Sequence, residues 1–304
     1  MLGGETAMTS SLEPAAVAHD ATEMFEAQRP RLQRLAYRML GSLAEAEDIV
    51  QDAWLRWRRV DPAGVQSAPA FLSKTVTRLC LDAMKSARAR RETYVGSWLP
   101  EPLVEFDMTP DQDGLTLTLM LALERLSPLE RAAFLLHDVF GVALDEIATT
   151  LKREPAAVRQ LAVRARQHVQ HARPRFPVAP EEGTRIAEAF FKATRSGDIN
   201  TLGAMLAENV VVHSDGGRKV HTFLNPIVGL QRVLRLYDGL RRKLGAQNDG
   251  LFRALKIDGL PGFLSHERDG VLQTTALQIE DGRITAIYIT RNPDKLQRVV
   301  GMET

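Results

Sequence analysis

The chain of 304 residues contains a single cysteine, Cys80, and this scarcity limits the chemistry that it can carry. One thiol excludes internal disulfides and cysteine-rich zinc sites, and it fits a reducing compartment such as the cytoplasm. No apolar run approaches the ~18 residues of a membrane-spanning helix, and the N-terminus lacks the apolar core of a signal peptide. The sequence therefore predicts a cytoplasmic protein that is not embedded in a membrane.

An excess of charge of one sign is also missing, because 39 Lys and Arg face 38 Asp and Glu, for a net charge of +1. No global basic field draws the chain to nucleic acid, so any such attraction must come from local clusters. The seven histidines show no metal-ligand spacing, and neither a phosphate-binding glycine loop nor a nucleophile motif occurs. We therefore expect no metal, no cofactor and no catalytic residues.

Proline, glycine and shifts in periodicity divide the chain into five expected parts. The C-terminal part begins with helical patterns and continues with apolar strands separated by Asp269-Gly270 and Asp281-Gly282, which are hairpin signals. Helices followed by an antiparallel meander indicate an α+β domain with helices on one sheet face. The expected parts are a flexible leader (1–20), a first helical block (21–95), a linker (96–113), a second helical block (114–176) and the α+β domain (180–304).

The second helical block contains a short amphipathic helix, a break and a basic helix. Leu144, Ile147 and Leu151 share one face of the first helix, and Pro155 can open the next helix because a first-turn residue needs no N–H. This pattern is typical of a helix-turn-helix, whose second helix enters the DNA major groove. A helical hairpin with a solvated basic face is the alternative.

Two further polar features lie in the first helical block. Asp48, Gln51, Asp52 and Leu55 follow the i, i+3, i+4, i+7 spacing and form either a solvated stripe or a docking face for a basic partner helix. The run from Lys85 to Arg91 is either a solvated basic stretch or the local positive charge that phosphate contacts require.

The linker carries Trp98-Leu99-Pro100-Glu101-Pro102, in which the two prolines favour an extended backbone. Exposed Trp98 and Leu99 would cost free energy, so the segment is either a stiff spacer or a peptide docked on another domain. In the α+β domain, residues 213–218 form either a simple hairpin turn or a glycine-containing loop whose polar groups contact a partner.

Several motifs resemble extracytoplasmic-function (ECF) RNA polymerase sigma factors. Residues 46–54 (AEDIVQDAW) resemble the sigma region 2 signature, and residues 126–131 (LSPLER) with 145–148 (DEIA) resemble region 4. Residues 98–102 (WLPEP), 215–218 (DGGR) and 292–296 (NPDKL) are similar to hallmarks of a subgroup with a C-terminal SnoaL-like domain. The resemblance implies a multidomain protein: two all-α sigma domains, a region 2 bundle and a region 4 helix-turn-helix, followed by an α+β, NTF2-like cone.

The resemblance also implies roles for particular residues. The helix of region 2 would bind core RNA polymerase, at the clamp helices of its largest subunit, through Asp48, Gln51, Asp52 and Leu55. Promoter DNA would be contacted at the −10 element by Lys74, Thr75, Thr77, Arg78, Lys85, Arg88, Arg90 and Arg91, and at the −35 element by Lys152, Arg153, Arg159, Gln160, Arg164 and Arg166. Regulatory contacts between domains would involve Trp98, Leu99, Pro100, Glu101, Pro102, Asp215, Gly216, Gly217, Arg218, Asn292, Pro293, Asp294, Lys295 and Leu296.

Two other function classes remain open at this point. A conventional helix-turn-helix regulator with a ligand-sensing C-terminal domain would bind duplex operators alone, usually as a dimer. An enzyme fused to a DNA-binding module could use His213 and Asp215, which lie two residues apart and would share one strand face. For the sigma factor, an anti-sigma factor or a small ligand at the C-terminal domain is a possible further partner.

Overall fold

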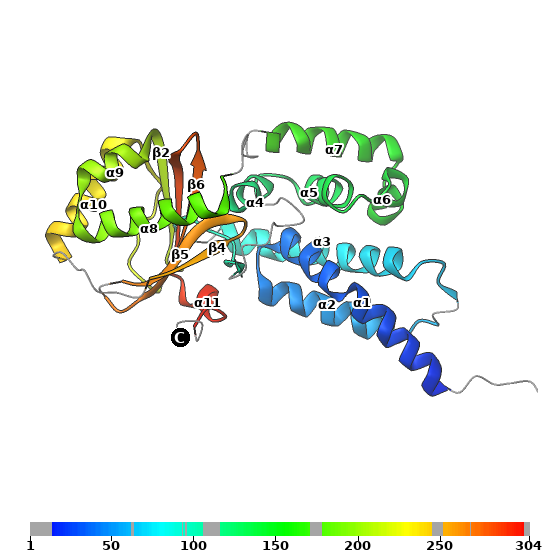
Figure 1. Cartoon of the computed structure of the whole chain (residues 1–304). Helices are drawn as coiled ribbons and strands as arrows, with labels where there is room; N and C mark the ends of the chain where they lie inside the picture. The colour runs from blue at the N-terminus through cyan, green and yellow to red at the C-terminus, as the bar shows by residue number, and fades with distance from the viewer. Residues whose placement is uncertain are drawn as a thin grey trace, which may run out of the picture. The chain divides into compact units, whose positions relative to one another are not determined.

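The computed structural model describes residues 14–61, 64–92, 94, 96–105, 116–170, 178–244, 252–267 and 269–300 (Figure 1). The chain divides into two compact units, residues 1–83 and 84–304, and each is described by itself.

The first unit consists of long helices. Helix α1 begins at Pro14, so the expected 20-residue leader is too long; proline suits a first helical turn, and the alanines that follow favour a helix. Residues 1–13 of that expected leader lie outside the described residues. The helices are α1 (Pro14–Leu40), α2 (Leu43–Trp57) and α3 (Ala68–Glu92), and α3 continues into the second unit.

Specific polar contacts fix these helices around an apolar core. Ser42 caps α2 by accepting a hydrogen bond from the amide of Glu45 at 3.3 Å. The buried indole of Trp57 donates to the carbonyl of Ala21 at 2.7 Å, which ties the end of α2 to α1. Cys80 lies fully buried in this core, and burial raises the pKa of its thiol, so the group acts as a small apolar side chain.

The expected second helical block lies in the second unit, and its described residues form four helices, α4 to α7. Ser127 and Glu130 form a capping box that opens α5, and Pro128 occupies its first turn. A π-helical turn, Leu135–Val139, follows α5. The helices are α4 (Leu117–Leu123), α5 (Pro128–Phe134), α6 (Leu144–Leu151) and α7 (Pro155–Val169).

The C-terminal domain is α+β, as expected, but its sheet is mixed. Strand β2 pairs in parallel with β7, and helix α10 interrupts the stretch expected to be strands. The strand order is β1-β4-β5-β6-β7-β2-β3. The elements are α8 (Pro180–Ser196), α9 (Ile199–Met205), β2 (Leu206–Asp215), β3 (Ile227–Val228), α10 (Leu230–Leu244), β4 (Phe252–Ile257), β5 (Leu260–His266), β6 (Leu272–Glu280), β7 (Arg283–Thr290) and α11 (Pro293–Leu296).

The two faces of this sheet carry different cores. Because side chains alternate along a strand, Val212 and Ile287 point toward the face covered by α8 and α10, while Tyr288 points to the other face. That other face packs against Leu99 of the linker and Leu117 of α4, and α11 adds Leu296. The expectation of helices on one face alone is therefore wrong: α8 and α10 cover one face, and α4 and α11 join the linker on the opposite face.

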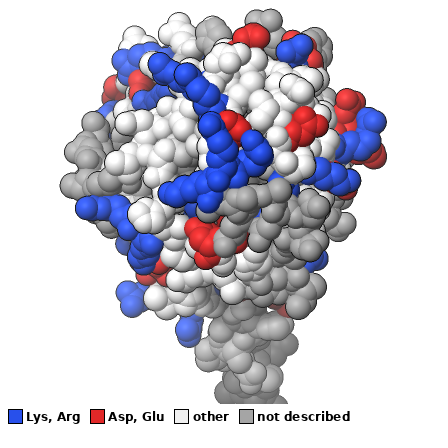
Figure 2. All heavy atoms as spheres, turned by 90° about the vertical axis from the view of Figure 1, so that its left-hand side faces the viewer, with Lys and Arg blue, Asp and Glu red and all other residues white. Residues whose placement is uncertain are grey.

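Charged side chains gather on the outer side of the C-terminal domain. Figure 2 faces the side on which Figure 1 places α10, and Lys and Arg there outnumber Asp and Glu. Helix α10 contributes exposed Arg232, Arg235, Arg242 and Lys243. Of the helices that the structure describes, none is both long and apolar enough to cross a bilayer. The described His, Cys, Asp and Glu residues include no group of three placed to hold a metal ion.

Candidate functional site

A buried carboxylate at the end of β2 binds the linker. Asp215 is 0% exposed, and its Oδ2 accepts hydrogen bonds from the amide of Leu99 at 2.9 Å and from Nζ of Lys295 at 2.7 Å. Its Oδ1 accepts from the amide of Gly217 at 3.1 Å and from the hydroxyl of Tyr94. Four donors, from residues 94–99, the loop after β2 and α11, thus compensate for the burial of one negative charge. We call Tyr94, Leu99, Asp215, Asn292 and Lys295 the linker latch.

Lys295 completes the latch from the C-terminal side. Its Nζ also donates to the carbonyl of Leu99 and lies 4.4 Å from the ring centroid of Trp98 and 5.3 Å from that of Tyr94. Asn292 donates to the hydroxyl of Tyr94 at 3.1 Å. Burial, and then the hydrogen bond and charge of Asp215, raise the pKa of Tyr94, so its hydroxyl stays protonated and donates to the carboxylate.

The loop after β2 needs glycine to fit against the latch. Gly217 has a φ of +61°, and a Cβ atom there would collide with the side-chain amide of Asn292. Asn292 in turn caps α11 by accepting from the amide of Asp294 at 3.1 Å. The expected loop residues 215–217 and the segment 292–296 therefore meet at one place. Arg218 is exposed and contacts no latch residue among those described.

The remaining linker residues also dock on the C-terminal domain. Leu99 is buried with the second sheet core, and Glu101, also buried, lies 3.6 Å from Nε of Arg298. The linker then forms β1 (Val104–Glu105), which pairs with the edge strand β4. The docked interpretation is thus confirmed for this segment, and the free stiff spacer is wrong, because the linker buries its apolar side chains and pairs its backbone.

The exposed face of α2 carries the expected polar stripe. Asp48, Gln51 and Asp52 are exposed and, within the described part of the chain, make no side-chain hydrogen bond or ion pair. Leu55 is 44% exposed at the end of the same stripe. Two unpaired carboxylates beside an exposed apolar side chain suit contact with a basic partner surface.

Helix α3 presents only part of its expected DNA-binding set. Lys74 and Arg78 are partly exposed and Lys85 is exposed, whereas Thr77 is fully buried and its hydroxyl donates to the carbonyl of Ser73 at 2.7 Å. Thr75 likewise donates to the carbonyl of Phe71, at 2.8 Å. The expectation for Thr77 is wrong for this conformation, because a buried, bonded hydroxyl cannot reach a base. The side chains of Arg88, Arg90 and Arg91 lie outside the described residues.

Helices α6 and α7 form the expected helix-turn-helix. Lys152 takes the left-handed conformation at the turn (φ 53°), a position where glycine is common, and Pro155 starts α7. The outward positions of α7 are exposed, and Arg159 and Gln160 have no partner among the described residues. Lys152 and Arg153 are exposed at the turn.

Two arginines of α7 are held by carboxylates of the same block. Arg164 lies 3.0 Å from Glu130 of α5, and Arg166 lies 2.7 Å from Asp138. Burial alone would raise the pKa of Glu130, but hydrogen bonds from Ser127 and the charge of Arg164 lower it overall. Glu130 therefore stays ionised and pairs α5 with α7.

Comparison with known proteins identifies the two helical parts. Residues 24–90 match the family model of Sigma-70 region 2, and residues 116–169 match that of Sigma-70 region 4. The chain is 37% identical over 290 residues to the ECF RNA polymerase sigma factor SigJ of Mycobacterium tuberculosis H37Rv, across 89% of this chain and 91% of that protein. The chain is an ECF RNA polymerase sigma factor.

Further relatives support the same family along most of the chain. A probable ECF sigma factor SigI of M. tuberculosis is 32% identical across 91% of this chain and 96% of its own length. The crystal structure of M. tuberculosis SigJ superimposes with a TM-score of 0.75 at 34% identity, covering 91% of this chain and 98% of that one. The matched length includes the C-terminal α+β domain as well as the two sigma regions.

Membership of this family assigns the general function. A sigma factor is a transcription initiation factor that binds core RNA polymerase and directs promoter recognition. Two sigma regions in the expected order favour this function over a conventional helix-turn-helix regulator. The pair His213 and Asp215 does not form an acid–base site: Asp215 is buried in the latch, and His213 stacks on Tyr288 with centroids 5.4 Å apart.

Sequence reasoning missed several residues that anchor the sigma domain and its linker. Tyr94 precedes the expected linker and carries no periodic or motif signal, yet it binds Asp215. Thr118 of α4 donates to Gln278 on β6 at 2.6 Å, and the amide of Leu117 donates to the carbonyl of Asp258 at 2.8 Å. These pairs are separated by more than a hundred residues, so only the fold brings them together.

Proposed function

We propose that separate exposed surfaces of the protein contact core RNA polymerase, the −10 element and the −35 element. The α2 stripe of Asp48, Gln51, Asp52 and Leu55 binds the clamp helices of the polymerase, because its carboxylates have no partner among the described residues and remain available. Helix α3 contacts the −10 element through its exposed cations, and α7 reads the −35 element. Since polymerase is the partner, the protein works in the cytoplasm.

Within α7, Arg159 and Gln160 are the proposed base readers. Arg and Gln pair bidentately with guanine and adenine edges, and recognition helices read bases from their N-terminal half. Both side chains lie in the first two turns of α7 and are uncommitted within the described residues. Arg164 and Arg166 fit phosphate contact or bracing of the helix, because each already binds a carboxylate.

We further propose that the C-terminal domain modulates this activity in cis through the linker latch. The observation that carries this proposal is that buried Asp215 binds the backbone of Leu99, in the segment joining the two sigma domains. Helix α4, the first helix of the second sigma domain, is anchored on the same sheet. A latched linker therefore restricts the positions that the −35-reading domain can take.

In vitro transcription with core RNA polymerase tests the cis modulation. Trp98→Ala removes the ring beside Lys295 and should change transcript yield severalfold while polymerase binding is retained. Val228→Ala, which trims a half-exposed side chain on β3, is the control and should leave the yield unchanged. An unchanged yield for Trp98→Ala with normal polymerase binding would refute the role of the latch.

A further inference from the structure

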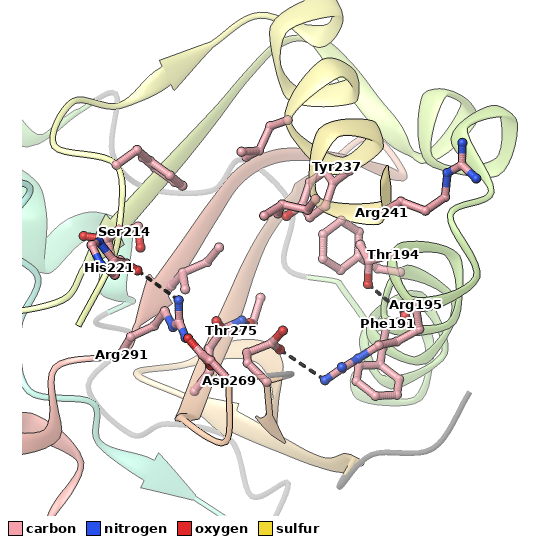
Figure 3. Close-up of a pocket in the computed structure, with 18 of the residues that line it drawn as sticks. Phe191, Thr194, Arg195, Ser214, His221, Tyr237, Arg241, Asp269, Thr275 and Arg291 are labelled. Atoms are coloured by element: carbon pink, nitrogen blue, oxygen red, sulfur yellow. Dashed lines mark hydrogen bonds and ion pairs between the residues drawn. The ribbon is translucent and has the colours of Figure 1, made fainter. Parts of the chain in front are cut away.

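The face of the sheet opposite the latch carries a cavity. It lies between α8, α10 and the strands, has a volume of about 450 Å³, and falls in the range of small-molecule sites (Figure 3). It lies wholly inside the C-terminal domain, whose α8 and α10 both pack on the sheet. No sequence motif predicts this cavity, because its lining comes from segments far apart in the chain.

The wall of the cavity is largely aromatic. Phe191 and Phe263 meet at 5.3 Å between centroids in a T-shaped arrangement, and Phe190 packs edge-on against Tyr237 at 5.7 Å. Leu236 of α10 and Ile289 of β7 add aliphatic surface. Aromatic rings in such arrangements favour a flat, apolar ring as their contact.

Hydroxyl groups line the same cavity, and two of them have no hydrogen-bond partner among the described residues. Ser214 is 2% exposed and Tyr237, a residue of α10, is partly buried, yet neither hydroxyl makes a hydrogen bond with any residue that the structure describes. Thr275 accepts from Gln273 at 3.0 Å and can still donate its own proton. Burial raises the pKa of Tyr237, so its hydroxyl remains a donor. Buried donors of this kind favour an acceptor oxygen on the molecule that contacts them.

The charged residues of the cavity wall are already paired. Arg291 binds Asp269 through two contacts of 2.7 and 2.6 Å, and Arg195 lies 3.2 Å from Glu267 (Figure 3). Arg241 lies 3.2 Å from Asp238 on its own helix. Because these cations are neutralised locally, the cavity offers no strong preference for a charged ligand.

We propose that this cavity binds an uncharged ring compound that carries an acceptor oxygen, and that its occupancy acts on the linker latch. The rings of α8 and β5 would hold the apolar body, and the hydroxyls of Ser214, Tyr237 and Thr275 would bind the oxygen. The effect of occupancy on the latch rests on the proposed modulation in cis, whereas the binding of a ring compound does not.

The cavity and the latch share two strands. Ser214 lines the cavity and the next residue, Asp215, holds the linker on the opposite face; Arg291 and Asn292 repeat this division after β7. The carbonyl of Asp215 accepts from the amides of both Arg291 and Asn292, at 2.8 and 3.0 Å. A shift of either strand end caused by a ligand would therefore move latch donors and acceptor together.

Binding is tested on the full chain with two probes of matched shape. 2-Acetylnaphthalene carries an acceptor oxygen, and 2-ethylnaphthalene has the same ring system without it. Titration calorimetry should show saturable binding of both, with the ketone about tenfold tighter (~1.4 kcal/mol), since only the ketone accepts hydrogen bonds from the cavity hydroxyls. Equal affinities would overturn the role of the hydroxyls.

Variants locate the binding site. Tyr237→Phe should weaken binding of 2-acetylnaphthalene severalfold and leave binding of 2-ethylnaphthalene unchanged, because the variant loses only a hydroxyl. Leu240→Trp places a large ring at the 42% exposed rim of the cavity and should abolish binding of both probes. Val228→Trp, outside the cavity, is the matched control. Binding that survives in Leu240→Trp, or that is absent from the unmodified chain, would overturn the proposal.

Hydrogen exchange tests the coupling separately. The amide of Leu99 is protected by Asp215, so saturating ketone should change its exchange rate in the unmodified chain and not in Leu240→Trp. Binding with unchanged exchange would overturn the coupling and leave the cavity as a ligand site. Because neither readout uses transcription, failure of the proposed modulation in cis is distinguishable from failure of this inference.

Discussion

The aspartates of α2 and the aspartate that ends β2 are the same residue type in opposite situations. Asp48 and Asp52 are exposed and have no hydrogen-bond partner among the described residues, whereas Asp215 is 0% exposed and accepts from four donors. An unpaired surface carboxylate contributes little to folding and remains available to another molecule. A buried, fully bonded carboxylate fixes its own chain and has nothing left to offer a partner.

This contrast distinguishes recognition from internal control in the sigma factor. Both sets were marked by short sequence motifs, yet only the structure tells which motif faces outward. A substitution of Asp215 should lower the stability of the fold. A substitution of Asp48 or Asp52 should affect only the association with polymerase.

The largest expected effect comes from removing the acceptor of the latch. Asp215→Ala leaves Lys295, the amide of Leu99 and the hydroxyl of Tyr94 without their common acceptor inside the protein. Breaking a buried charge pair by removing one partner costs about 3–5 kcal/mol. Hydrogen exchange should show faster exchange of the amide of Asp258, which donates to Leu103 of the docked linker at 2.9 Å.

A nearby exposed pair provides the control for this variant. Asp294 lies 2.6 Å from Lys219, but both side chains are more than half exposed (55% and 54%). Asp294→Ala should therefore lower the free energy of unfolding by less than ~1 kcal/mol and leave hydrogen exchange at the docked linker unchanged. If both variants gave the same protection of the linker, Asp215 would not be its principal anchor.

A smaller effect is expected from the glycine beside the latch. Gly217→Ala combines a strained φ of +61° with a collision against Asn292, and we expect a loss of about 2 kcal/mol, within the range for such strained positions. Gly270→Ala shares a positive φ of +75° but has nothing within 4 Å, so it isolates the backbone strain. The thermal unfolding temperature of Gly217→Ala should be lower than that of Gly270→Ala. Equal decreases in unfolding temperature would show that contact with Asn292 contributes nothing.

Local patterns were enough to predict much of the sigma domains. The capping box at Ser127, the proline that opens α7 and the amphipathic stripe of α2 are signals contained within one turn or two of helix. The docked linker was an open alternative, because Trp98 to Pro102 fits both a spacer and a bound peptide. The burial of Thr77 was not predicted, because a hydroxyl in a helix can bond to a carbonyl of its own helix, here that of Ser73.

The C-terminal domain was harder to predict because its contacts are long-range. The parallel pairing of β2 with β7 and the addition of β1 to β4 depend on segments that no local pattern connects. Tyr94 reaches Asp215 across 121 positions, and the cavity draws its lining from two helices and four strands or their ends. Composition and spacing specify neither a partner nor a cavity assembled in this way.

The smallest expected effect on stability, with a clear effect on association, comes from the α2 stripe. Replacing Asp48 and Asp52 by Asn should leave the free energy of unfolding within ~0.5 kcal/mol of the original, because neither carboxylate has a partner in the part of the chain that the structure describes. Affinity for core RNA polymerase should fall about tenfold, ~1.4 kcal/mol, and the loss should shrink at high salt, where screening weakens contacts between charged surfaces. Glu181→Gln with Asp281→Asn removes two exposed charges from the C-terminal domain and is the matched control. Equal polymerase affinity for the two double variants would show that net charge, rather than the α2 stripe, governs docking.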